Sequence, residues 1–240
     1  MAAWKTALPT SVRTGATPSS CVHSSFIVPA PSSPPRHHLS ATSAGPSHHS
    51  SDSAEPEMKQ PLILSLALDE KLHSHLTSLR TKYFPSARNH LQGHITLFHA
   101  LPATYLSDLL DTLTSLTHAM QPFNVHVKPP VLRGGKEKKA VFVPLQAAKL
   151  RALRSDLLRT FSKDLKMPLT DQDRNPTFWP HATIVNKVTA EEAENVFEEL
   201  NASGEVSQRS GGEAEGLDLW WYRGGPWEHI RTFHFGPNAL

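Results

Sequence analysis

The chain has 240 residues, a formal net charge of +2, 38% hydrophobic residues and a single cysteine. One cysteine excludes a disulfide framework and a thiolate zinc cluster within the chain, and the nearly balanced charge gives no indication of a nucleic-acid coat protein. No stretch approaches the ~20 apolar residues of a membrane-spanning helix, so we expect no membrane association and a reduced cytoplasmic setting, with mitochondrial or nuclear localisation as alternatives.

The first 56 residues differ in composition from the rest. They contain eight of the 20 prolines, and no acidic residue precedes Asp52. Such a segment buries too little apolar surface to offset its ordering entropy, so residues 1–56 are predicted to be a disordered Ser/Pro/His-rich tail. The basic residues Lys5, Arg13 and Arg36 leave a transit peptide as the alternative. Residues 57–240 are predicted to form one domain.

Periodic apolar patterns begin near Pro61 and predict strands where they alternate and helices where they recur every three to four residues. In chain order they give a strand at 62–68, a helix at 72–83, a strand around 94–97, a helix at 106–116, and a strand at 123–127. The same order follows again, with a strand at 140–144, a helix at 150–161, a strand around 181–184, a helix to Leu200 opened by the capping-box pair Thr189 and Glu192, and strands at 217–222 and 229–235.

Each half therefore has the order strand, helix, histidine-bearing strand, helix, strand, and Gly134-Gly135 marks an exposed hairpin turn near the boundary of the halves. This duplicated order predicts an α+β fold with two pseudo-symmetric lobes. We expect antiparallel-rich sheets that line a central groove, with helices outside.

Two short motifs stand at equivalent places in the two halves. They read His94-Ile95-Thr96-Leu97 and His181-Ala182-Thr183-Ile184. In a strand, residues two apart share a face, so each histidine lies beside its threonine while the aliphatic residues face a core. Two such strands side by side would place two imidazoles and two hydroxyls around one cleft.

Two imidazoles and two hydroxyls in one cleft suit in-line attack on a phosphodiester. Histidine titrates near neutrality, so one imidazole can accept a proton while the other donates one, and hydroxyls can donate hydrogen bonds to the non-bridging oxygens. We interpret His94 and His181 as the proton-transfer pair and Thr96 and Thr183 as phosphate ligands. Which histidine is the base stays open, and the alternative is that both are ordinary strand histidines.

The motifs and their surroundings resemble the 2H phosphoesterase superfamily, which includes 2′-5′ RNA ligase-like proteins and 2′,3′-cyclic phosphodiesterases. The resemblance covers roughly residues 60 to 236 and includes the stretches YFPSARNHLQGHITLFHALP, LTDQDRNPTFWPHATIVNKV and LWWYRGGPWEHIRTFHF. It implies metal-free, cofactor-free chemistry on a phosphodiester next to a ribose hydroxyl, with RNA 3′ ends or small nucleotide phosphodiesters as substrates. We expect a monomer.

Five further residues are candidate substrate ligands, each with a structural alternative. Lys187 shares the face of His181 if its strand continues, or else lies in solvent. Arg88 and Arg174 precede the motif strands and either clamp a phosphate or are solvated. Phe98 and Trp179 flank the motifs and either stack on a base or pack in the core.

Two other functions compete with the phosphodiesterase interpretation. The first is a non-catalytic RNA- or nucleotide-binding module that uses the same groove, although a pure binder would not need two proton carriers. The second is a metalloenzyme with His94, His99 and His181 as ligands, against which stands the lack of a carboxylate or cysteine at ligand-like spacing. The substrate itself and the choice between hydrolysis and ligation stay open.

Overall fold

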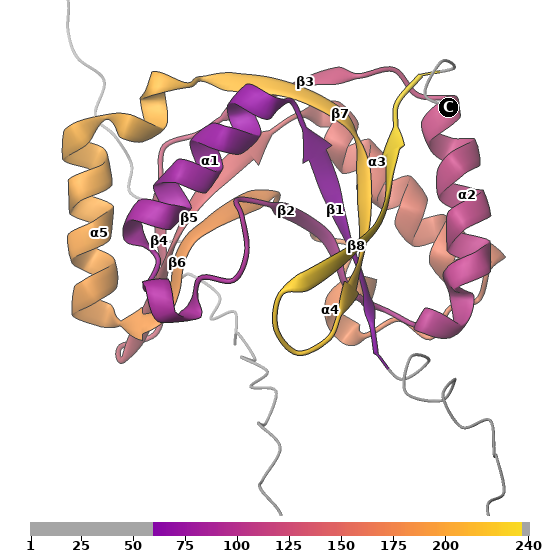
Figure 1. Ribbon diagram of the computed structural model, residues 1–240, viewed down its shortest axis with the longest axis horizontal. Coiled ribbons are helices and arrows are strands. Elements are labelled where there is room, and N and C mark those ends of the chain that lie inside the picture. The colour runs from indigo at the N-terminus through magenta and orange to yellow at the C-terminus, as the bar shows by residue number, and fades with distance from the viewer. Residues whose placement is uncertain (1–59, 237–240) are drawn as a thin grey trace, which may run out of the picture. The chain divides into compact units, whose positions relative to one another are not determined.

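The computed structural model describes residues 60–236 (Figure 1). The tail predicted over residues 1–56 lies outside this range. The strands are β1 (Leu62–Leu68), β2 (Ile95–Leu101), β3 (Phe123–Val127), β4 (Val131–Gly134), β5 (Lys138–Gln146), β6 (His181–Thr189), β7 (Gly211–Tyr222) and β8 (Trp227–His234). The helices are α1 (Glu70–Tyr83), α2 (Leu106–His118), α3 (Ala148–Arg159), the short α4 (Asp171–Arg174) and α5 (Ala190–Ser203). None of the helices within this range is long and apolar enough to cross a membrane.

The duplicated order is confirmed, as β1-α1-β2-α2-β3 in the first half and β5-α3-β6-α5-β7 in the second. All strand pairs are antiparallel, which confirms the α+β class. The two halves join in one eight-stranded sheet in which β7-β1-β2 continues through β6-β5-β3. The junction of β2 and β6 is therefore the centre of a pseudo-twofold arrangement.

The last strand of each half has crossed to the other half. β3 closes the first half in sequence but pairs with β5, and β7 closes the second half but pairs with β1. In Figure 1, α1 and α5 lie in the left half of the view and α2 and α3 in the right half. Each half thus contains a strand that belongs in sequence to the other half, so neither half can be completed without the other.

Capping residues determine where two of the helices begin, and a glycine turn determines where the β4–β5 hairpin reverses. The Asp69 side chain accepts a hydrogen bond from the Leu72 amide and caps α1. The predicted capping box of Thr189 and Glu192 is present at the start of α5. The predicted turn at Gly134-Gly135 joins β4 to β5, and Gly134 has the positive φ of 138° that only glycine adopts readily.

The aliphatic residues of both motifs lie in the core as predicted. Ile95, Leu97, Ala182 and Ile184 are each at most 1% exposed. Burial of these side chains holds the motif strands in place, because turning either strand over would expose them to water.

The expectation that Phe98 shares the face of His94 and Thr96 is wrong. Phe98 is completely buried, with its ring 5.0 Å from that of Phe161. The cause is a β-bulge, because Ser65 of β1 pairs with Thr96 whereas the preceding Leu64 pairs with Phe98. The extra residue in β2 turns Leu97 and Phe98 to the core one after the other, so Phe98 belongs to the core, as its structural alternative had it.

Candidate active site

The two motif strands meet at their middle residues, because Ile95 and Ala182 are register partners in antiparallel β2 and β6. One step in opposite directions along the two strands sets each histidine opposite the threonine of the other motif. The facing pairs are His94 with Thr183 and Thr96 with His181. The imidazoles therefore occupy diagonal positions, which in an antiparallel pair lie roughly 7–8 Å apart and leave room for one phosphoryl group.

The same hydrogen bond orients both imidazoles. His94 Nδ1 lies 2.8 Å from the Gln92 carbonyl oxygen, and His181 Nδ1 lies 2.7 Å from the Trp179 carbonyl oxygen. A carbonyl only accepts, so Nδ1 carries the proton in each ring. In the neutral ring, Nε2 is then the nitrogen that can accept a proton from a substrate.

Burial lowers the pKa of both motif histidines. The pKa of His94 falls to about 4, chiefly through burial and also through the positive charge of Arg80, against the opposing effect of its bond to the Gln92 carbonyl. The pKa of His181 is also lowered, mainly by burial, with Arg133 contributing. Both rings are therefore neutral at pH 7 while the cleft is empty.

Aromatic side chains pack against each imidazole. The Trp227 ring centroid lies 4.4 Å from that of His94, and the Trp179 centroid lies 4.5 Å from that of His181. The guanidinium of Arg133 sits 3.8 Å above the Trp179 ring. Trp179 therefore packs against His181. Trp227, which lies far along the chain in β8, was not among the predicted site residues.

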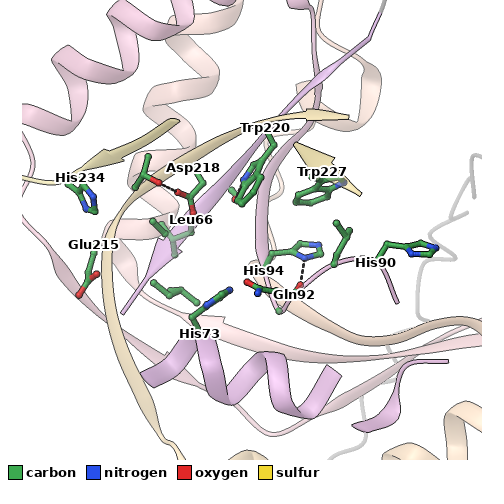
Figure 2. A pocket seen from close by; sticks show the side chains of 16 residues that line it. Leu66, His73, His90, Gln92, His94, Glu215, Asp218, Trp220, Trp227 and His234 are labelled. Atoms are coloured by element: carbon green, nitrogen blue, oxygen red, sulfur yellow. Dashed lines mark hydrogen bonds between the residues drawn. The ribbon is translucent and has the colours of Figure 1, made fainter. Parts of the chain in front are cut away.

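A cavity of about 470 Å³ adjoins His94. Figure 2 shows His94 at its edge, with Trp220 and Trp227 on one side and His73 on the other. Gln92 and Asp218 add polar groups to its lining. A mixed aromatic and polar lining of this size suits a small organic ligand bound next to the imidazole.

Comparison with known families decides the identity of this arrangement. Residues 68–226 match the model of the 2′-5′ RNA ligase superfamily. The chain belongs to this superfamily. It is a member of the 2H phosphoesterases, as the paired motifs indicated.

The structure was also compared with solved structures. The TT0787 protein of Thermus thermophilus is 18% identical, with a TM-score of 0.52 over 74% of this chain and 99% of that one. LigT of E. coli in its apo form is 14% identical, with a TM-score of 0.44 over 74% and 98% of the two chains. LigT of E. coli complexed with 3′-AMP is 14% identical, with a TM-score of 0.45 over 73% of this chain and 98% of that one. A search of curated proteins gives no match.

Two buried arginines, which the sequence reasoning missed, support the motif strands of this 2H phosphoesterase. Arg80 of α1 is 5% exposed and donates to the carbonyl of Thr183 at 2.8 Å. Arg154 of α3 is 4% exposed and donates to the carbonyl of Leu97 at 2.8 Å. Both stand at core positions of an apolar helical stripe, and a charged residue at such a position was the available signal.

The remaining predicted substrate ligands are Arg88, Lys187 and Arg174, and their contacts are with the protein itself rather than with the motif histidines. Arg88 donates to the carbonyl of Lys187 at 3.0 Å. Lys187 is exposed at a positive φ of 55°, which breaks the regular alternation on which its placement beside His181 depended. Arg174 bonds the carbonyl of Leu169 and pairs with Asp171, so it ties down its own loop.

The metalloenzyme alternative required His94, His99 and His181 to act as ligands together. Over residues 60–236, no group of three or more His, Cys, Asp or Glu side chains is arranged to hold a metal ion.

Proposed function

We propose that this protein is a phosphodiesterase that acts on RNA- or nucleotide-type phosphodiesters, either a 2′,3′-cyclic phosphate or a 2′-5′ linkage. The crossed register of the motif strands carries the proposal. It supports a phosphoryl group between two diagonal imidazoles, with the hydroxyls of Thr96 and Thr183 donating to its non-bridging oxygens.

Hydrolysis of a cyclic phosphate then needs two proton transfers. Water forms a bond to phosphorus and gives its proton to Nε2 of one imidazole. The bond from phosphorus to the 2′ or 3′ oxygen breaks, and the other imidazole protonates that oxygen. We propose His94 as the base, because its pKa is lowered to about 4, and His181 as the acid. Both protons are moved by side chains of the chain itself, so the proposed reaction needs no metal ion.

The cavity beside His94 is our candidate site for the nucleoside. Its volume of about 470 Å³ and its tryptophans, Trp220 and Trp227, suit a nucleobase. Base stacking on an aromatic side chain typically contributes about 1–3 kcal/mol. The phosphoryl group then lies over the strand junction, and the sugar oxygen that leaves faces His181, the proposed acid.

A substrate panel tests the proposal. We expect turnover, in the presence of EDTA, of at least one of 2′,3′-cyclic nucleotides, ADP-ribose cyclic phosphate, 2′-5′ dinucleotides and short RNAs ending in a cyclic phosphate, with products resolved by chromatography. His94→Ala and His181→Ala should each lower kcat by about 10²–10⁴-fold while the melting temperature stays near that of the wild type. His126→Ala, an exposed histidine of β3, is the control.

Two outcomes would contradict the proposal. Full activity in either motif variant would remove the proton-transfer assignment. Tight nucleotide binding without turnover of any panel member would instead favour the non-catalytic binding module.

A further inference from the structure

The bulge in β2 determines which way His99 points. Leu97 and Phe98 both point to the core, so His99 resumes the face of Thr96 and is half exposed. Thr96 faces His181 across the strand junction, so the bulge sets His99 on the side of β2 that carries the proposed proton carriers. A regular strand would have turned this side chain away from them.

A buried carboxylate contacts this third ring. Asp173 of α4 is 1% exposed, and its Oδ1 lies 3.4 Å from His99 Nδ1. The same carboxylate accepts hydrogen bonds from the backbone amides of His99 at 2.8 Å and Ala100 at 2.9 Å. Burial opposes its ionisation, but these hydrogen bonds prevail and hold the pKa of Asp173 below its usual value, so the carboxylate is charged at pH 7.

This contact determines which nitrogen of His99 is available. A carboxylate only accepts, so Nδ1 donates to Asp173 and Nε2 points away from it. Within residues 60–236, Nε2 has no hydrogen-bond partner. Arg154 in turn donates to the carbonyl of Asp173 at 2.7 Å, which fixes the segment that carries the carboxylate.

We propose that His99 is a third substrate-binding imidazole, which contacts the anionic phosphoryl group through Nε2, and that Asp173 is the residue that positions it. The proposal rests on the proposed function only in placing that group between His94 and His181. Structural capping of two backbone amides would explain the Asp173 bonds to β2, but not its contact with the His99 ring on the face of Thr96.

Inorganic phosphate is the probe, because its binding does not depend on turnover. In an NMR titration of the full chain, we expect the His99 Nε2 signal to shift on phosphate binding. His99→Gln should weaken phosphate binding about tenfold, because the flexible amide, which Asp173 no longer orients, does not hold a donor at the position of Nε2. In turnover assays the same variant should raise KM more than it lowers kcat, because the proton-transfer pair is intact.

A double-mutant cycle separates positioning from stability. Asp173→Asn should weaken phosphate binding several-fold in the wild-type background and have little effect once His99→Gln is present. His229→Gln is the matched control, because this strand histidine is similarly exposed and lies 3.8 Å from the carboxylate of Asp218; its phosphate affinity should be unchanged.

Unchanged phosphate affinity in a folded His99→Gln variant would overturn the inference, as would equal effects of Asp173→Asn in both backgrounds. Wild-type protein that binds phosphate through His99 but turns over no panel member would count against the proposed function alone.

Discussion

At the scale of single residues, the cleft uses burial to keep its imidazoles neutral. Catalysis by two histidines needs one neutral ring and one protonated ring at the same time. Because the pKa of His94 is lowered to about 4 and that of His181 is also lowered, the empty cleft at pH 7 holds two bases and lacks an acid. The productive combination becomes more populated as pH falls below 7.

We therefore predict an acidic optimum for kcat/KM, which reports the free protein. The profile should peak below pH 6.5 and fall by about tenfold per pH unit on its alkaline side. It is measured from pH 4 to 9 with a 2′,3′-cyclic nucleotide. Because the pKa of His94 is lower in the folded protein than in the unfolded chain, the free energy of unfolding decreases as pH falls from 6.5 toward 4. The melting temperature must therefore be measured at each pH. An optimum at pH 7.5 or above would contradict the prediction.

At the scale of elements, the entry to β2 packs on the backbone of α1. A Cβ at Gly93 would lie 2.7 Å from the carbonyl carbon of Leu76 and 2.8 Å from the amide nitrogen of Thr77. The Gly93 amide also donates to the Thr77 hydroxyl at 3.1 Å. This close approach sets the position of His94, the next residue in the chain.

Gly93→Ala should therefore push the start of β2 away from α1. We expect a loss of about 1–3 kcal/mol in the free energy of unfolding, as for other overpacked sites, and a fall in kcat of up to about 10²-fold from displacement of His94. Denaturant unfolding and steady-state kinetics measure the two effects. Gly135→Ala is the control, because a Cβ there meets nothing within 4 Å; an equal loss in both variants would argue against this contact.

The elements themselves were largely predictable, and the exceptions have physical causes. Strand and helix patterns gave the duplicated order because each element buries one face. The bulge was not readable, since Leu97 and Phe98 are apolar and fit a regular strand equally well. Its consequence was a wrong placement of Phe98 and no expectation that His99 lies on the face of Thr96, so a single unpaired residue affected two side chains.

At the scale of the whole folded part, pairing between distant strands could not be read from local pattern. Nothing in the periodicity indicates that β3 pairs with β5 while β7 pairs with β1. Each motif strand also depends on a helix from the other half. Arg80 follows β1 in sequence yet bonds β6, and Arg154 follows β5 yet bonds β2.

These two arginines give a matched pair of variants for the last prediction. Arg80→Met and Arg154→Met should each destabilise the fold by at least about 2 kcal/mol, because buried carbonyls lose their donors. Of the two guanidinium groups, only that of Arg80 lowers the pKa of His94; removing that positive charge favours the protonated ring and raises the pKa. The acidic limb of kcat/KM should therefore move to higher pH in Arg80→Met and stay in place in Arg154→Met. Equal shifts in both variants would show that loosened packing, rather than charge, sets the titration of His94.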